Sequence, residues 1–297
     1  MKSFSIYGNC QAKALMQTLL KNEVFANTYN YKDLKPIQTI LEEEVHLAEA
    51  IFKEADLLLH QIVSNSYHIP SLRTASLKAY RKINSLSIAF PYTYFNAYFP
   101  ELDTYHGTKS ILSLVHDYNI MLGYVKGLSQ QQISDLIQDQ NFYSQPITLT
   151  IRNESIDSLS WRENLLETKI SNYILHNYTK IKLFNIFNHP KGIIFDHIAN
   201  QVFTLLKMPT IEESLLSETY LDSKSIIAPI YPSTHKNLNL QFKEEFTTYL
   251  TMNGYLQQDE VIFEFFKTYS QFNKDAMLQE IKIKKPFIID LFKELDV

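Results

Sequence analysis

The sequence has a single cysteine, Cys10, among 297 residues, so it cannot form an intrachain disulfide framework. It has no charged-then-apolar leader at Met1 and no apolar run of about 18 residues. Positive charge is not in excess either, because 28 Lys and Arg residues stand against 32 Asp and Glu residues. Nucleic-acid binders need such an excess to neutralise phosphates. We therefore expect no nucleic-acid partner, no transmembrane segment and a cytoplasmic location.

The chain is rich in hydrophobic residues, and strand-like segments alternate with helical ones along its first part. Hydrophobic residues make up 45% of it and aromatic residues 13%, which is enough for one large core or a core with a smaller appended unit. Strands alternating with helices predict an α/β fold with a mostly parallel sheet flanked by helices. Strand-like runs occupy residues 2–8, 55–63 and 85–90, and helical periodicity occupies residues 12–22, 37–52 and 71–83.

Beyond Pro100 the pattern is mainly helical. Long amphipathic helices are predicted at 108–127 and 155–180, a fourth strand at 182–187 and a closing helix at 192–206. The stretch 209–241 resembles an irregular connection, and residues 242–297 are helical again. The sequence thus predicts an α/β catalytic domain at 1–208, with a helical insertion at about 105–180, and a helical C-terminal extension at 209–297 that packs on the core.

Cys10 stands where the first strand gives way to a helix. The unpaired N–H groups and the positive end of the helix dipole at such a position lower a thiol pKa and favour the thiolate. The same N–H groups can stabilise an oxyanion when an acyl carbonyl is attacked, and Gly8 gives the turn room. A lone cytosolic cysteine is often simply buried packing, so the sequence leaves both interpretations open.

A cysteine nucleophile normally needs a base. His189 directly follows the strand predicted at 182–187 and precedes Pro190 and a helix. Residues that follow neighbouring strands of a parallel sheet converge on one crevice. We therefore predict that Cys10 and His189 form a catalytic pair at the carboxyl edge of the sheet, with the sulfur and a ring nitrogen within hydrogen-bond reach. A separation of more than about 8 Å would contradict the pair.

The segments "GNCQ" and "NHP" resemble the first and last blocks of SGNH-type esterases and acyltransferases, with cysteine in place of serine. In that pattern a carboxylate that orients the histidine stands three residues before it, where this chain has Ile186. The amide of Asn185 or Asn188 is an alternative orienting group, and a simple dyad is another.

Several motifs in order extend the resemblance. The chain is similar to the WcbI family of capsular polysaccharide enzymes through "YGNCQ", "ADLLLHQIVSNSYH", "FPYTYFNAYFPE", "SWRENL", "LFNIFNHP" and "APIYPSTHKNLNL", over residues 3–241. This resemblance implies a Rossmann-like fold related to SGNH proteins and binding of coenzyme A or acetyl-CoA as co-substrate. It also implies acylation of a sugar hydroxyl during capsule or other surface polysaccharide biosynthesis.

The sequence offers further candidate site residues besides Cys10 and His189. Gly8, Asn9, Gln11, Gln61 and Asn188 are candidate oxyanion or orienting groups. On the helix predicted at 71–83, Arg73, Arg81 and Lys82 are candidates for binding the phosphates of coenzyme A, the alternative being a solvated basic face. The histidine spacings are poor for metal ligands, so we expect no metal. Arg162 and Glu163 beside Trp161 fit either a structural ion pair or a substrate clamp.

Three functions remain open from the sequence. The first is an acyl-CoA-dependent O-acetyltransferase that uses Cys10 and His189 on a carbohydrate acceptor. The second is an SGNH-like esterase or thioesterase that passes the acyl group to water. The third is a non-catalytic carbohydrate-binding protein, for which Ile186 at the carboxylate position is the best argument. The sugar, the acyl group and the oligomeric state are not specified, and a homo-oligomer stays open.

Overall fold

The chain forms two compact units, each built from separate stretches of sequence. The computed structural model describes residues 1–223 and 226–295. The sequence had predicted a single division near residue 208, with one helical insertion, and the observed division differs from it. Unit 1 comprises Met1–Tyr94, Ile156–His176 and His189–Lys224, and unit 2 comprises Phe95–Ser155, Asn177–Asn188 and Ser225–Val297.

A four-stranded parallel sheet forms the centre of unit 1. Its strands are β1 (Lys2–Tyr7), β2 (Tyr29–Tyr31), β3 (Leu57–His60) and β4 (Leu86–Ala89), in the order β2-β1-β3-β4. The three predicted strands are confirmed, whereas β2 was missed because a three-residue strand is too short to show alternation. In the register, Tyr7 pairs with His60 and His60 with Ala89, so the carboxyl ends of β1, β3 and β4 are level.

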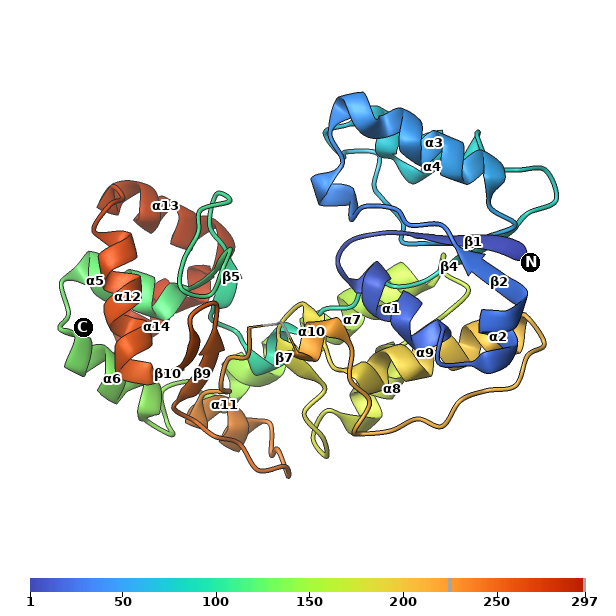
Figure 1. Cartoon of the computed structure of the whole chain (residues 1–297). Coiled ribbons are helices and arrows are strands. Elements are labelled where there is room, and N and C mark those ends of the chain that lie inside the picture. Colours follow the sequence, from blue (N-terminus) through green and yellow to red (C-terminus); the bar gives the residue numbers. More distant parts are fainter. Residues whose placement is uncertain (224–225, 296–297) are drawn as a thin grey trace. The chain divides into compact units, whose positions relative to one another are not determined.

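Helices cover both faces of this sheet, as Figure 1 shows. Helices α1 (Gln11–Leu19) and α9 (Gly192–Leu205) pack together on one face. Helices α3 (Val45–Glu54) and α4 (Thr74–Lys78) cover the other, where Tyr7 joins their buried side chains in one apolar cluster. A short helix, α2 (Glu23–Thr28), leads into β2. The expected α/β arrangement with a flanked parallel sheet is therefore present.

Two predicted helices of unit 1 are shorter than their apolar pattern. The helix predicted at 37–52 begins with the 3-10 turns Ile37–Thr39 and Glu42–Glu44. The Glu44 side chain accepts from the Leu41 N–H and so caps the second of these turns, which runs directly into α3. The helix predicted at 71–83 is a 3-10 turn, Pro70–Leu72, followed by α4.

The helix predicted at 155–180 is two helices, α7 (Gln145–Glu163) and α8 (Ser171–Asn177). The break has a clear cause in the Glu163 carboxylate, which accepts from the backbone N–H groups of Ile170 and Ser171 and from the Ser171 hydroxyl. A buried side chain at the end of α7 thus caps the beginning of α8.

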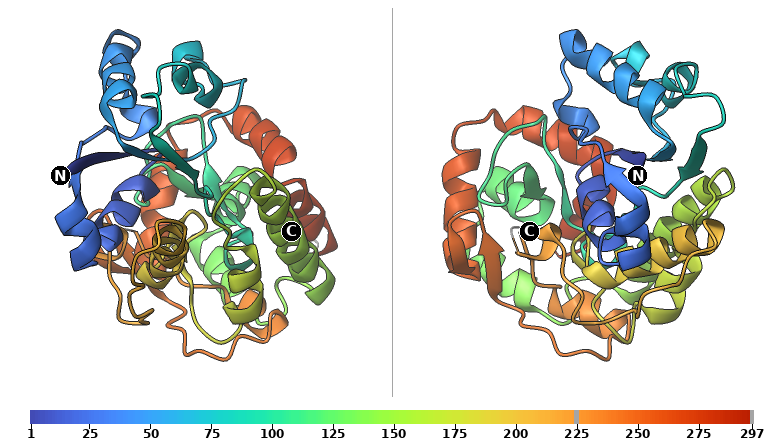
Figure 2. Two further views of the ribbon diagram at one scale, coloured as in Figure 1. Left: turned by 90° about the vertical axis from the view of Figure 1, so that its right-hand side faces the viewer. Right: turned by 45° about the vertical axis from the view of Figure 1, so that its right-hand side comes forward.

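Unit 2 is mainly helical, and its C-terminal helices (orange to red in Figures 1 and 2) pack around α5 and α6. The predicted helical C-terminal region is therefore confirmed. The remaining elements of unit 2 are two antiparallel pairs, β5 with β6 and β9 with β10, and the short elements β7 and α11. Their bounds are α5 (Tyr118–Lys126), α6 (Gln130–Gln138), α11 (Pro232–Asn237), α12 (Gln258–Tyr269), α13 (Lys274–Lys284), α14 (Pro286–Glu294), β5 (Leu102–Thr104), β6 (Val115–Asp117), β7 (Phe184–Ile186), β9 (Thr248–Thr251) and β10 (Gly254–Gln257).

Two predictions in unit 2 are wrong. The helix predicted at 108–127 begins only after Asp117, whose side chain accepts from the N–H groups of Asn119 and Ile120 and so caps α5. Of the preceding residues, Val115–Asp117 form β6 instead. The strand predicted at 182–187 exists as β7, but it does not belong to the four-stranded sheet.

Buried acids distinguish the core of unit 2. Burial raises the pKa of Glu101 well above its ordinary value, and it raises the pKa of Asp117 to about 6 although the Tyr231 hydroxyl donates a hydrogen bond to it. Lys285 is buried nearby, and burial lowers its pKa. Burial in unit 2 therefore makes these carboxyl groups easier to protonate than the same groups in water.

Candidate functional site

The turn after β1 is held by the side chain of Gln61, which follows β3. The Asn9 N–H donates to Gln61 Oε1 over 2.9 Å, and the Gln11 N–H donates to Asn9 Oδ1 over 2.9 Å. A Cβ on Gly8 would lie 2.7 Å from the same Gln61 oxygen, so a larger residue here would displace the Gln61 side chain from the turn. Four of the predicted orienting residues, Gly8, Asn9, Gln11 and Gln61, therefore lie together around Cys10.

The side chain of Gln11 fastens this turn to the loop after β4. Gln11 Nε2 donates to the Thr93 carbonyl over 2.6 Å, and the Thr93 N–H donates back to Gln11 Oε1 over 3.0 Å. Gln61 Nε2 makes a longer contact of 3.4 Å with the Pro91 carbonyl. Both amides thus have backbone partners, and their role toward an oxyanion stays a prediction.

The Cys10 thiol is partly buried at the start of α1. Burial raises its pKa, while hydrogen bonds from the Tyr220 hydroxyl and from the backbone N–H groups of Cys10 and Gln11 act in the opposite direction. The expected lowering of this pKa is therefore wrong in net sign, because desolvation of the thiolate outweighs the helix terminus. The two N–H groups nevertheless lower the thiol pKa, in the direction that the sequence predicted, while the Gln11 N–H also donates to Asn9.

Tyr220 reaches Cys10 from a distant part of the chain. It opens the short helix α10 (Tyr220–Ser223), and its hydroxyl donates to the Cys10 carbonyl over 2.6 Å. Its backbone N–H donates to Gln17 Oε1 of α1 over 3.0 Å, and the ammonium of Lys13 lies 5.2 Å from its ring centroid. Tyr220 is thus anchored to α1 by backbone, ring and hydroxyl.

Residues 214–222, which we call the strap, lie against both α1 and α9. Lys21 donates to the Ser217 hydroxyl over 2.8 Å, and the Ser214 N–H donates to Asp196 of α9 over 3.3 Å. At the start of α9, a Cβ on Gly192 would lie only 2.0 Å from the Ser217 carbonyl oxygen. The strap therefore packs on α9 at the closest distance that a backbone permits.

The sequence analysis missed the strap because it lies in the stretch predicted to be an irregular connection. One local signal was present: Thr219 and Asp222 have the spacing of a helix-start capping pattern. In the structure Asp222 Oδ2 accepts from the Thr219 N–H over 2.9 Å and from the Thr219 hydroxyl over 3.2 Å. This pattern could have located α10, but not its position beside Cys10.

His189 lies in the short strand β8 (His189–Pro190), just before α9. Burial lowers the pKa of its imidazole to about 4, and the carboxylate of Asp222 acts against this effect. The strap thus supplies a carboxylate near His189, a group that position 186 lacks. Asn185 and Asn188 belong to unit 2, so their suggested role toward His189 stays a prediction.

The three predicted coenzyme A-binding cations do not share one helix. Arg73 precedes α4 and donates twice to the Tyr67 carbonyl, whereas Arg81 and Lys82 follow the end of α4. Lys82 pairs with Asp56, which directly precedes β3. This places Lys82 at the amino edge of the sheet, opposite Cys10, so we leave it out of the site. For Arg73 and Arg81 the role stays a prediction.

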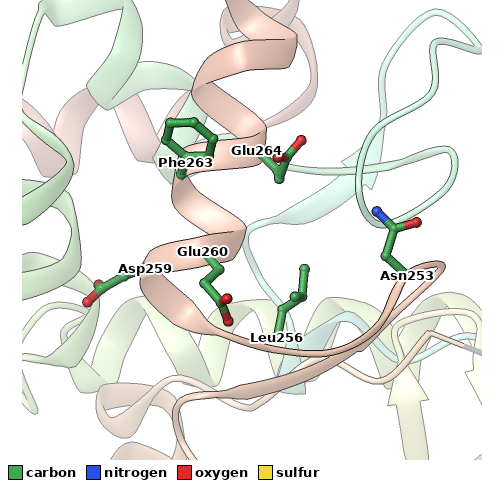
Figure 3. A pocket seen from close by; sticks show the side chains of 6 residues that line it. All are labelled: Asn253, Leu256, Asp259, Glu260, Phe263 and Glu264. Carbon is green, nitrogen blue, oxygen red and sulfur yellow. The ribbon is translucent and has the colours of Figure 1, made fainter.

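A shallow pocket lies in unit 2, along α12 and the hairpin before it (Figure 3). Its acids have structural partners: Asp259 accepts from Ser134, Glu260 accepts from the Gln257 N–H, and Glu264 pairs with Lys267.

Within residues 1–223 and 226–295, no group of three or more His, Cys, Asp or Glu side chains is arranged to hold a metal ion. Over the same residues, no helix is long and apolar enough to cross a membrane.

Comparison with known proteins gives one family and one fold. The family model described as polysaccharide biosynthesis enzyme WcbI matches residues 3–210. A solved structure of WcbI, a novel polysaccharide biosynthesis enzyme, matches with a TM-score of 0.86 and 18% identity over 98% of each chain. It is described as the native protein without a disulfide bond between coenzyme A and one of its cysteines. At this identity the match shows the fold. No curated protein matches the sequence.

Proposed function

Because the chain belongs to the WcbI family of polysaccharide biosynthesis enzymes, we propose that it transfers an acyl group, in the simplest case acetyl, from coenzyme A to a sugar hydroxyl. The carbohydrate is a precursor of a capsular or other surface polysaccharide. The order β2-β1-β3-β4 with helices on both faces supports a Rossmann-like relation to SGNH enzymes.

One observation supports the proposal: residues of the strap act on both candidate catalytic residues. Tyr220 acts on Cys10 by a hydrogen bond, and two positions later Asp222 acts on the imidazole of His189 through its charge. The helices that follow these residues, α1 and α9, also pack on each other. A thiol, an imidazole and a carboxylate supplied in this way are the groups that acyl transfer through a nucleophile and base requires.

In the proposed first step, the Cys10 sulfur attacks the thioester carbonyl while the thiol proton passes to His189. The carbon–sulfur bond to coenzyme A breaks, and the proton leaves with coenzyme A as its thiol. We assign the stabilisation of the oxyanion to the Cys10 N–H group, whose effect on the thiol pKa supports this role. The exchange of one thioester for another is close to balanced in energy.

In the proposed second step, His189 takes the proton of the sugar hydroxyl as its oxygen attacks the acyl carbon. The bond from that carbon to Cys10 breaks, and His189 returns the proton to the sulfur. With a pKa of about 4, the imidazole is neutral at neutral pH and can accept a proton. Asp222 stabilises the imidazolium that forms.

A direct transfer is the second candidate, and the raised pKa of Cys10 favours it. In that route His189 removes the sugar proton while the oxygen attacks the thioester carbon of coenzyme A itself. The carbon–sulfur bond breaks, His189 returns the proton to the sulfur of the leaving coenzyme A, and Cys10 only positions the donor. The description of the solved relative, which names coenzyme A together with a cysteine, supports a donor sulfur beside the thiol in both routes.

Acyl trapping separates these routes. Because Cys10 is the only cysteine, an acetyl group that appears on the protein as a thioester after mixing with acetyl-CoA marks this residue. The covalent route predicts this adduct by intact-protein mass spectrometry and its absence in Cys10→Ala. If Cys10→Ala transfers acetyl to sugar as fast as the native chain, the covalent route is wrong.

Coenzyme A binding tests the function against its alternatives. We expect coenzyme A to raise the melting temperature of the native chain and of His189→Gln, while His189→Gln loses transfer. His46→Gln is the matched control, because His46 is exposed on α3. Absence of a shift at millimolar coenzyme A, with acyl-sugar hydrolysis intact, would instead favour the esterase.

A further inference from the structure

Unit 1 contains a mostly apolar pocket of about 300 Å³ beside the carboxyl ends of β3 and β4. Two of the lining side chains are open to solvent: Trp161 is 74% exposed and Leu165 is 73% exposed. An exposed indole at the rim of an apolar pocket offers a flat face on which a ring can stack. The other walls include Ile62, Phe90, Tyr92 and Arg162.

Arg162 supplies a positive charge to this pocket. Its Nε donates to the Ser158 carbonyl over 3.1 Å and its Nη1 to the Tyr92 carbonyl over 3.0 Å, while the guanidinium lies 4.3 Å from the Tyr94 ring centroid. Its Nη2 is buried and has no hydrogen-bond partner in the part of the chain that the structure describes. The guanidinium is thus fixed in position, and one of its nitrogens has no acceptor within the pocket wall.

No carboxylate compensates this charge among residues 1–223 and 226–295, where Arg162 forms no ion pair. Its sequence neighbour Glu163 is directed instead at the start of α8. The structural ion pair considered from the sequence is therefore absent, and the substrate-clamp alternative gains support. A fixed, uncompensated cation in an apolar wall favours an anionic ligand.

The pocket wall is also continuous with the turn that holds Cys10. Pro91 lines the pocket, and its carbonyl is in contact with Gln61, whose side chain accepts from the Asn9 N–H. Thr93, next to Tyr92, is bonded twice to Gln11. Hydrogen bonds through Gln61 and Gln11 thus connect the pocket wall to the turn.

We propose that this pocket binds the adenosine 3′-phosphate end of coenzyme A, with the purine ring stacked on Trp161 and the phosphate held by Arg162. This inference rests on the proposed function and names a site for its donor. The lining has few polar side chains to pair with the several hydroxyls of a sugar, whereas a purine presents a flat apolar face. An acidic sugar would share the ring and the negative charge, and the test below separates the two.

Trp161 is the only tryptophan in the chain, so its fluorescence reports on this pocket alone. The probe is adenosine 3′,5′-bisphosphate, which has no thiol and cannot react at Cys10. We expect saturable quenching, with adenosine 5′-phosphate binding about tenfold more weakly, since it lacks the 3′-phosphate. Glucuronate should leave the emission unchanged. Quenching by glucuronate but not by the bisphosphate would overturn the assignment in favour of an acidic acceptor.

Charge variants test the role of Arg162. Arg162→Gln should remove the preference for the 3′-phosphate, with circular dichroism confirming the fold. Because Arg162 also holds two backbone carbonyls, a second variant, Ser64→Glu, places a carboxylate in the exposed part of the wall instead. It should weaken bisphosphate binding at least tenfold, whereas Gln38→Glu, the matched exposed control, should not. Equal effects of these two variants would contradict a local role.

The two proposals fail in different ways. If calorimetry shows coenzyme A binding while Trp161 emission stays unchanged, the pocket assignment is wrong and the acyl-transfer proposal stands. If the bisphosphate quenches Trp161 but acetyl-CoA supports no transfer to any sugar, the pocket assignment stands and the transferase proposal fails.

Discussion

The hydroxyl of Tyr220 donates a 2.6 Å hydrogen bond to the carbonyl oxygen of Cys10, which lies 210 positions earlier in the chain. The same hydroxyl acts on the thiol, where it lowers the pKa against the larger effect of burial. One side chain thus fixes the backbone of the turn and influences its sulfur. This relationship makes the reactivity of Cys10 a measure of the position of the strap.

Tyr220→Phe should slow the alkylation of Cys10. The variant keeps the ring but removes the hydrogen-bond donor, so the thiol pKa rises further and less thiolate is present at a given pH. A neutral hydrogen bond contributes about 1 kcal/mol, which corresponds to a roughly fivefold lower rate with iodoacetamide at pH 8. Tyr255→Phe, on an exposed ring of β10, is the control. Faster alkylation would mean that Tyr220 acts mainly as a cover over the sulfur.

Asp222→Asn should lower the pKa of His189 below its present value of about 4, because the carboxylate is the group that opposes burial there. The amide can still accept from Thr219, so the strap keeps its local structure. The imidazole titration is followed by NMR, and the rate of acyl transfer should fall by tenfold or more. In Asp157→Asn, an exposed change on α7, neither quantity should move. An unchanged His189 titration in Asp222→Asn would exclude the orienting role.

Gly192→Ala should displace the strap. The new Cβ would lie 2.0 Å from the Ser217 carbonyl oxygen, and a backbone atom cannot yield as a side-chain tip can. Overpacking of this kind costs about 1–3 kcal/mol. We expect a lower urea midpoint together with the altered Cys10 alkylation rate of Tyr220→Phe. Leu216→Ala, in the same strap but 89% exposed, should change neither. A destabilised variant with native alkylation would show that Tyr220 holds its place independently of Ser217.

Acid should weaken unit 1 more than unit 2. Burial lowers the pKa values of His60 and His189 to about 4, below the unfolded value of about 6.5. The unfolded chain therefore binds more protons in this range, and stability is lost as the pH falls from about 6.5 to about 4. For each histidine, the pKa difference between the folded and unfolded chain corresponds to roughly 3 kcal/mol of stability lost when the pH falls below both values.

In unit 2 the buried histidine and the buried carboxyl groups change stability with pH in opposite directions. His116 behaves like the two histidines of unit 1, but the pKa of Asp117 is raised to about 6 and that of Glu101 is raised as well. These carboxyls keep protons that the unfolded chain releases, so their contribution falls as the pH rises. Hydrogen exchange at pH 5 and pH 7, corrected for intrinsic rates, should show lost protection at pH 5 in unit 1 and little loss in unit 2. Equal losses would contradict these shifts.

The sheet and the position of Cys10 could be predicted from the sequence because both depend on local patterns. Alternating apolar residues define β1, β3 and β4, and the shift from period 2 to period 3.6 places Cys10 between a strand and a helix. The helix α9 was also foreseen, since its apolar face is continuous. In each case the residues that decide the structure are neighbours in the chain.

The errors arise where one distant or polar side chain overrides such a pattern. Asp117 starts α5 halfway through an amphipathic run, and Glu163 ends one helix while it caps the next. The net rise in the Cys10 pKa depends on how deeply the turn is buried, which no local spacing reveals. Tyr220 and Asp222 reach the site only through tertiary packing on α1 and α9.

The long separation between Cys10 and Tyr220 has a consequence during synthesis of the chain. At about 5–20 residues per second, the ribosome makes Tyr220 roughly 10–40 s after Cys10, given the 210 residues between them. The first strand and helix can already have folded by then, but the thiol has neither the tyrosine hydroxyl nor the cover that the strap provides. The nascent chain therefore carries an uncovered thiol until translation is three-quarters complete, and oxidants or electrophiles in the cell can reach it in that interval more easily than in the finished protein.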